Sequence, residues 1–233
     1  MAGLAGGRLR HRPDDRRRRR GEHHLTAPSD AIGHDELVWY AAYGSNLLAG
    51  RFTCYLEGGR PPGAARTYVG CRDTRPWRAS RPVAIPGQLC FGGLSPTWGG
   101  GLAFLTHPAA GEARGRGYLV TAGQLADLAR QEARVGPEHR LTLTPAGGRW
   151  HDVVPAYESV LGLGELDGHP AFTLTTAGSL AAAPPAPAYV RTILAGLVET
   201  YGGTPAEHAD YLLAAPGVAA GWSGSTLTAL IDP

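Results

Sequence analysis

Residues 37–47 read Leu-Val-Trp-Tyr-Ala-Ala-Tyr-Gly-Ser-Asn-Leu, an apolar run that ends at a turn signal. A short apolar run bounded by a turn predicts a buried strand, here Leu37–Ala42. Residues 47–56 then place apolar side chains at helical spacing, which predicts a helix with Ser45 or Asn46 as its N-cap. The first N–H groups of a helix lack partners within it, so this strand, turn and helix can together hold a carboxylate or an oxyanion.

Further strands and helices are expected downstream as parts of the same domain. The apolar runs predict strands at 68–71, 83–85, 88–91, 102–105, 117–120, 141–143, 150–157 and 171–175. Helical patterns cover 121–133, 187–201 and 205–213. In the first of these helices, Thr121 is the expected N-cap, and Gln124 three residues later completes a capping box. Its buried face is expected to hold Leu125, Leu128 and Ala129.

Composition and charge narrow the class of protein. Hydrophobic residues make up 43% of the chain and charged residues 18%, which is a globular composition. All 22 basic residues are Arg, so no lysine can act as a nucleophile or form a Schiff base. The excess charge lies in residues 1–36, which read as a disordered tail around Arg16–Arg20. Residues 38–233 hold 14 Arg and 14 acids, and this balance argues against a nucleic-acid surface.

Cysteine and histidine placement disfavours disulfide and metal chemistry. Cys54, Cys71 and Cys90 form no Cys-x-x-Cys pair, so a reducing, cytoplasmic location is expected. The nine histidines lack paired ligand spacing, which disfavours a zinc-dependent deacylase. No apolar run is long enough for a membrane span, and the first twenty residues lack the apolar segment of a secretory signal.

Glu132 is the candidate acid/base. It falls in the last turn of the helix predicted at 121–133, on the same side as Leu125 and Leu128, and should therefore face the interior. A partly buried carboxylate can exchange protons near neutral pH. The alternative is a solvated helix-end glutamate paired with Arg130 or Arg134. Ser45 lacks the Gly-x-Ser-x-Gly context of a nucleophile, so a hydrogen-bonding role is favoured for it.

Four segments, taken in order, resemble the γ-glutamylcyclotransferase-like proteins. Residues 42–47 are similar to the family's signature after its first strand. Residues 97–103, with Trp-Gly-Gly-Gly before a strand, are similar to its Trp-x-Gly-Gly segment. Residues 128–132 are similar to the helix end that carries its catalytic glutamate, and residues 183–189 to its Pro-rich turn and tyrosine. The resemblance covers about residues 38–215.

The resemblance implies a fold, a reaction and a set of site residues. The fold would be α+β, with a mixed six-stranded, barrel-like core flanked by helices, in a domain spanning 37–222 followed by an extension at 223–233. The reaction would be intramolecular aminolysis of a γ-glutamyl amide, giving 5-oxoproline and a free amine or amino acid. Glu132 would be the catalytic acid/base. The substrate-binding residues would be Tyr43, Gly44, Ser45, Asn46, Leu47 and Tyr189.

The same resemblance implies that neither metal nor cofactor is needed. The expected partner is a small γ-glutamyl substrate, with no nucleic acid and no membrane, and the chain should be a monomer or a simple homodimer.

Two departures from the family pattern leave alternatives open. The family usually has glycine after its glutamate, whereas this chain has Ala133-Arg134. Residues 59–81 form a loop richer in arginine than the family leads one to expect, and these side chains either bind an acidic substrate or merely solvate the loop. The arginines in question are Arg60, Arg66, Arg72, Arg75, Arg78 and Arg81. The alternatives are another metal-independent amide-cleaving acyltransferase or deacylase, or a non-catalytic binding module.

Overall fold

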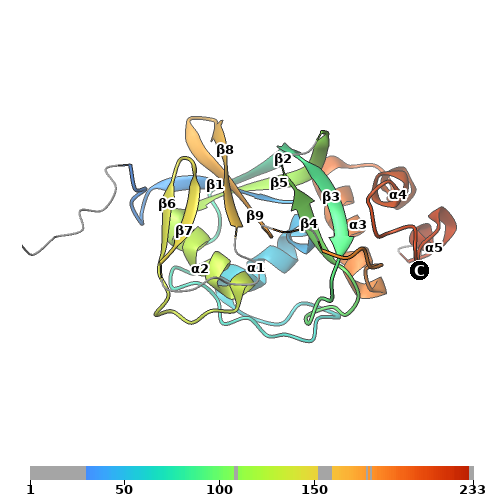
Figure 1. Ribbon diagram of the computed structural model, residues 1–233. Helices are drawn as coiled ribbons and strands as arrows, with labels where there is room; N and C mark the ends of the chain where they lie inside the picture. Colours follow the sequence, from blue (N-terminus) through green and yellow to red (C-terminus); the bar gives the residue numbers. More distant parts are fainter. Residues whose placement is uncertain (1–29, 108–109, 152–158, 177, 179, 231–233) are drawn as a thin grey trace, which may run out of the picture.

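The structure, a computed structural model, describes residues 30–107, 110–151, 159–176, 178 and 180–230 (Figure 1). The predictions for residues 1–29 and 152–157 lie outside the described residues. The strands are β1 (Leu37–Ala42), β2 (Ala79–Pro86), β3 (Gln88–Gly92), β4 (Leu102–Thr106), β5 (Glu112–Thr121), β6 (Leu141–Thr144), β7 (Gly147–Trp150), β8 (Ser159–Leu166) and β9 (His169–Thr175). The helices are the 3-10 helix η1 (Ser45–Leu47) and α1 (Ala49–Glu57), α2 (Ala122–Ala133), α3 (Pro187–Tyr201), α4 (Pro205–Leu213) and α5 (Gly224–Thr228).

The main sheet has seven strands in the order β2-β5-β1-β9-β8-β7-β6, and β3 and β4 form a separate pair. Strands β1 and β9 run parallel, and the other pairings within these sheets are antiparallel. Thr175 Oγ1, at the end of β9, is 2.9 Å from both the amide nitrogen and the carbonyl oxygen of Leu105, which brings β4 against the main sheet. The expected α+β class with a mixed sheet is confirmed, with seven strands in the main sheet rather than six.

Both faces of β1 are covered, which explains its unbroken apolar sequence. Val38, Tyr40 and Ala42 pack into one hydrophobic cluster with α1 and α2. Ala41 and Tyr43 pack into a second cluster with the β3–β4 pair, α3 and α4 (Figure 1). Successive side chains of a strand point to opposite faces, so β1 joins the two halves of the core.

Several predicted elements are confirmed. Thr121 caps α2, with its Oγ1 accepting from the Gln124 amide at 3.1 Å and the Gln124 side chain accepting in return at 3.0 Å. Leu125, Leu128 and Ala129 are buried on this helix as expected. Helices α3 and α4 have the predicted bounds, and each begins with a proline, whose fixed φ suits a first helical turn.

Two predictions of secondary structure are wrong, and one strand was missed. The first helix begins at Ala49 with Leu48 as its N-cap, because residues 45–47 form η1 and the Asn46 side chain bonds elsewhere. No strand forms at 68–71, where the only ladder contact is an isolated bridge between Gly59 and Tyr68. Strand β8 was not predicted, because glycines at 162 and 164 interrupt its apolar pattern.

The ordered chain extends beyond 37–222 on both sides. Near the N-terminal side, the Ile32 amide donates to the Leu143 carbonyl at 2.8 Å. Beyond residue 222, α5 buries Leu227 completely in the cluster formed with α3 and α4. These contacts make the flanking segments part of the same packed unit.

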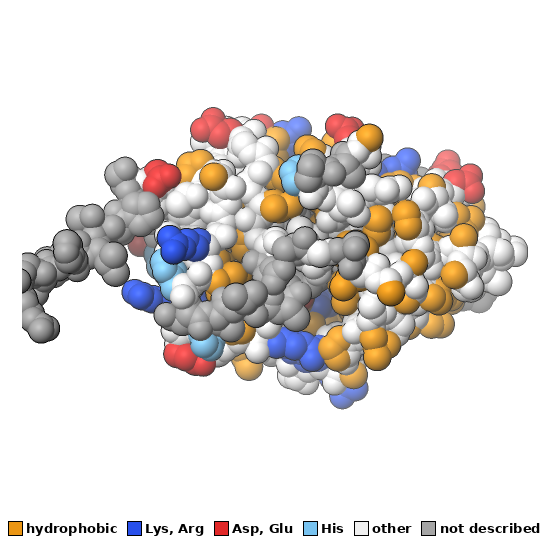
Figure 2. Space-filling view, in the orientation of Figure 1, with side chains coloured by type: hydrophobic (Ala, Val, Ile, Leu, Met, Phe, Trp, Pro, Cys, Tyr) orange, Lys and Arg blue, Asp and Glu red, His pale blue; other side chains and the backbone are white. Residues whose placement is uncertain are grey.

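The surface shows no large patch of one charge on the face in Figure 2. There, exposed hydrophobic side chains concentrate over the C-terminal helices at the right, while acidic and basic side chains are scattered around the edges. No helix among the described residues combines the length and apolar character required to cross a membrane.

Helix α3 packs directly on the backbone of the loop that follows β1. A Cβ atom on Gly196 would lie 2.5 Å from Leu47 Cβ and 2.5 Å from the Leu48 amide nitrogen. Real side chains do not approach this closely, so only glycine allows this contact. Glycine at 196 therefore allows α3 to pack against residues 47 and 48 at this distance.

Replacing Gly196 with alanine should lower the free energy of unfolding by about 2 kcal/mol, because the helix must move off the loop. The matched control is Gly50→Ala in α1, where a Cβ would meet nothing within 4 Å. That change should raise the free energy of unfolding by about 0.5 kcal/mol through reduced chain entropy. Urea titrations of both variants measure the difference, and equal effects at the two sites would contradict this account of the α3 contact.

The end of α2 holds a non-glycine residue in the left-handed region. Arg134 has φ 58° and ψ 36°, and its amide donates to the Arg130 carbonyl to close the helix. Glycine is the usual residue in this conformation, because a Cβ there costs about 1 kcal/mol. The Arg134 side chain donates from Nη2 to Thr97 Oγ1 at 3.2 Å.

We therefore expect Arg134→Gly to be more stable than Arg134→Ala by about 1 kcal/mol, since both lose the side-chain bond but only glycine relieves the backbone. Thermal and urea unfolding of the two variants give the comparison. Equal stability of the two would show that the left-handed conformation carries no strain at this position.

Candidate active site

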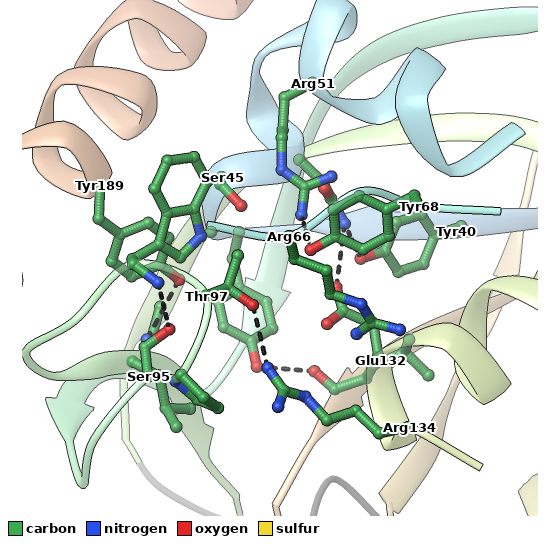
Figure 3. A pocket seen from close by; sticks show the side chains of 18 residues that line it. Tyr40, Ser45, Arg51, Arg66, Tyr68, Ser95, Thr97, Glu132, Arg134 and Tyr189 are labelled. Atoms are coloured by element: carbon green, nitrogen blue, oxygen red, sulfur yellow. Dashed lines mark hydrogen bonds between the residues drawn. The ribbon is translucent and has the colours of Figure 1, made fainter. Parts of the chain in front are cut away.

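A pocket lies at the C-terminal end of β1, where six segments of the chain converge (Figure 3). It is lined by Tyr43–Asn46 after β1, Arg51 of α1, Arg66 and Tyr68 of the long loop, Ser95–Trp98 between β3 and β4, Glu132 and Arg134 at the end of α2, and Tyr189 of α3. The pocket thus brings together residues that are distant in the sequence.

The loop after β1 is held through its carbonyl groups. The Tyr118 hydroxyl donates to the Asn46 carbonyl at 2.8 Å and to the Leu47 carbonyl at 3.3 Å. The Leu47 amide donates back to the Gly44 carbonyl at 3.0 Å. The amides of Ser45 and Asn46 open η1, where N–H groups have no acceptor within the helix. This arrangement fixes the loop from its carbonyl side and suits it to receive negative charge at its opening amides.

Glu132 is joined to this loop through Asn46. The Asn46 Nδ2 donates to Glu132 Oε1 at 3.4 Å and to the Tyr40 hydroxyl at 3.1 Å. Glu132 is partly buried. Burial first, and then the charge of Glu132, raise the pKa of Tyr40, and they do the same for Tyr55. Both phenols therefore stay protonated as possible donors around the carboxylate.

The expected alternative for Glu132, an ion pair with a neighbouring arginine, is not what the structure shows. Arg130 Nη1 pairs with Asp127 at 2.6 Å, and Arg134 bonds Thr97. Glu132 instead faces the pocket beside the loop.

Tyr189 reaches the pocket from the first turn of α3. Its hydroxyl accepts from the Ala103 amide at 3.2 Å, and its ring stacks on Trp98 with centroids 5.4 Å apart. Burial raises its pKa, so the hydroxyl keeps its proton. A Cβ on Gly44 would come within 3.1 Å of this hydroxyl, so glycine at 44 allows the close approach. The phenol is thereby set beside the loop.

Of the seven predicted site residues, six line the pocket and one does not. Leu47 is fully buried in the cluster shared with α3, and it contributes to the loop only through its backbone. Its side chain serves the packing under the loop.

The arginines of the Arg-rich loop differ in position: one lies where it could bind an acidic substrate, and others lie outside the pocket. Arg66 lines the pocket and donates to the Gln131 carbonyl at 2.8 Å. Three others pair with acids outside the pocket: Arg72 with Asp127, Arg75 with Asp73, and Arg81 with Asp167. Pairs with an exposed arginine contribute little to stability. The pairs with Asp127 and Asp167 attach this segment to α2 and to the turn between β8 and β9.

Several lining residues were not predicted from the sequence. Of these, Tyr68, Thr97 and Trp98 lie in loops whose course depends on tertiary packing. Arg51 did give a signal, because it lies four residues before Tyr55 and shares the buried face of α1 with it. Among the described residues, no three His, Cys, Asp or Glu side chains gather in a way that could hold a metal ion.

No protein-family model matches the chain. Among curated proteins, it is similar to histone deacetylase 5 of Arabidopsis thaliana, with 31% identity over 206 residues that cover 76% of this chain and 31% of that protein. The chain thus spans about a third of that relative's length.

Among solved structures, the chain is similar to a γ-glutamyl cyclotransferase and to an uncharacterised protein from Homo sapiens. Each is 22% identical over 77% of this chain and 88% of its own, with TM-scores of 0.47 and 0.46.

Proposed function

We propose that the protein is a γ-glutamyl cyclotransferase, which cleaves a γ-glutamyl amide by attack of the substrate's own α-amine. The observation that carries the proposal is the Asn46 side chain, which joins the Glu132 carboxylate to the loop that opens η1. A proton-transfer group and a candidate oxyanion site thus share one pocket, as an acyl-transfer reaction requires.

The reaction needs one proton to move and one charge to be stabilised. The α-amine nitrogen bonds to the γ-carbonyl carbon and gives its proton to Glu132. The resulting oxyanion lies toward the amides of Ser45 and Asn46. Glu132 then returns the proton to the leaving nitrogen as the amide C–N bond breaks, and 5-oxoproline and a free amine result. The substrate must be bent for this attack, and a pocket closed by Tyr189 and Trp98 supplies that orientation.

Glu132→Gln should lower the rate of 5-oxoproline release by about a hundredfold or more, because an amide cannot accept the proton. The measurement is product formation by chromatography from a panel of γ-glutamyl dipeptides and γ-glutamyl amines. Glu138→Gln is the matched control, since Glu138 is exposed, lies outside the pocket and contacts His139. Full activity of Glu132→Gln would remove Glu132 from the reaction.

A second candidate is a deacylase that releases a free acid. The similarity to a protein named histone deacetylase 5 favours testing it, although the chain matches only 31% of that protein. An acetyl-lysine peptide would then give acetate, whereas the cyclotransferase would leave it intact and cyclise a γ-glutamyl substrate. Acetate release without 5-oxoproline from any γ-glutamyl compound would replace the first proposal, and binding without either product would favour a non-catalytic module.

A further inference from the structure

Arg51 is a buried arginine on the wall of the pocket. It is 3% exposed, and its guanidinium carbon lies 4.4 Å from the ring centroids of both Tyr55 and Tyr68. Its Nη2 donates to the Tyr68 hydroxyl at 2.7 Å and to the Tyr55 hydroxyl at 3.2 Å. Figure 3 shows the side chain descending from α1 toward the pocket. The guanidinium is thus held in place by two aromatic side chains.

Among the described residues this cation forms no ion pair, although Glu132 acts on it from a longer distance. Within the described residues, no carboxylate lies in ion-pair distance of Arg51, and its Nε and Nη1 atoms are buried without a hydrogen-bond acceptor. Burial acts to lower its pKa, but Tyr55, Tyr68 and Glu132 together raise the pKa above its usual value, so the group is charged. A buried charge with unused donors is costly unless something compensates it.

The pocket as a whole also favours an anion. Among the described residues, the side chains that line it include three arginines, Arg51, Arg66 and Arg134, and one carboxylate, Glu132. Arg66 and Arg134 already donate to oxygens of Gln131 and Thr97, and both are more exposed than Arg51. Of these three arginines, Arg51 is therefore the most buried and the one with buried donors that lack an acceptor.

We propose that Arg51 binds the α-carboxylate of the substrate, and this inference rests on the proposed cyclotransferase function. The α-amine has to reach Glu132, and the α-carboxylate is attached to the same carbon atom. Tyr55 links the two sites, because it accepts from Arg51 and its pKa responds to the charge of Glu132. A carboxylate beside the attacking amine thus lies on the Arg51 side of the pocket. Nε and Nη1 are the donors left for this carboxylate, since neither has an acceptor among the described residues.

The test compares two ligands that differ only in the α-carboxylate, γ-glutamyl-alanine and 4-aminobutanoyl-alanine. Calorimetry on the Glu132→Gln protein measures both dissociation constants without turnover. We expect γ-glutamyl-alanine to bind between about tenfold and a hundredfold more tightly, as for a hydrogen bond to a charged group. Adding Arg51→Gln should bring that ratio to within about threefold of one, and Arg51→Lys should keep part of it.

The ratio separates binding from folding, because a loss of folded protein lowers both signals together. Arg72→Gln is the matched control, since Arg72 pairs with Asp127 outside the pocket, and it should leave the ratio unchanged. A ratio near one in the parent protein, or a ratio that survives Arg51→Gln, would overturn the assignment.

The wild-type enzyme gives an independent readout. Alanine release from the same two compounds tests the cyclotransferase reaction, which yields 5-oxoproline from one and 2-pyrrolidinone from the other. Release with equal kcat/KM for both would uphold the reaction and reject Arg51 as the carboxylate site. No release, together with a carboxylate-dependent binding ratio, would reject the reaction and keep the anion site.

Discussion

The hydrogen bond from the Tyr118 hydroxyl to the Asn46 carbonyl ties the candidate site to the sheet. Tyr118 lies on β5, which pairs with both β1 and β2, and its ring stacks on Phe52 of α1 with centroids 4.0 Å apart. The same residue therefore fixes the strand before the loop, the helix after it and the loop itself. Because the Tyr118 hydroxyl donates to the carbonyls of Asn46 and Leu47, the loop is held on that side. The amides of Ser45 and Asn46 can then donate to a ligand.

The sequence predicted those parts of this arrangement that depend on interactions between residues close together in the chain. The apolar run of β1, the Thr121–Gln124 capping box and the proline starts of α3 and α4 each act within a few residues, and the structure has all of them. The position of Glu132 followed from the same helical spacing. The prediction of the N-cap of α1 was wrong because of a tertiary contact. The Asn46 side chain bonds Tyr40 and Glu132 instead of the helix end.

The rest of the pocket depends on contacts between distant segments. Thr97 and Trp98 reach it because Gly100 and Gly101 let the chain pass against residues 183–185, where a Cβ on Gly101 would overlap the Ala183 carbonyl. Arg66 reaches it because its loop bonds the end of α2. Neither contact has a local sequence pattern. The Arg-rich composition of this loop was visible, but only the folded chain separates Arg66, which lines the pocket, from the loop arginines that pair with acids outside it.

Several departures from ordinary stability rules meet in this one pocket. Arg134 keeps a left-handed backbone where glycine would be easier, Arg51 is a buried cation with unused donors, and the Asn46 side-chain oxygen is buried without a partner. Strain and unsatisfied groups of this kind persist at sites whose geometry is selected for a ligand. The fold alone is compatible with many activities, so it cannot choose among them. The proposed anionic substrate would compensate the buried charge of Arg51, whose Nε and Nη1 have no acceptor among the described residues. For Arg134 the structure gives a packing role, because it closes α2 and bonds Thr97, so Arg51 is the residue that the proposed ligand has to explain.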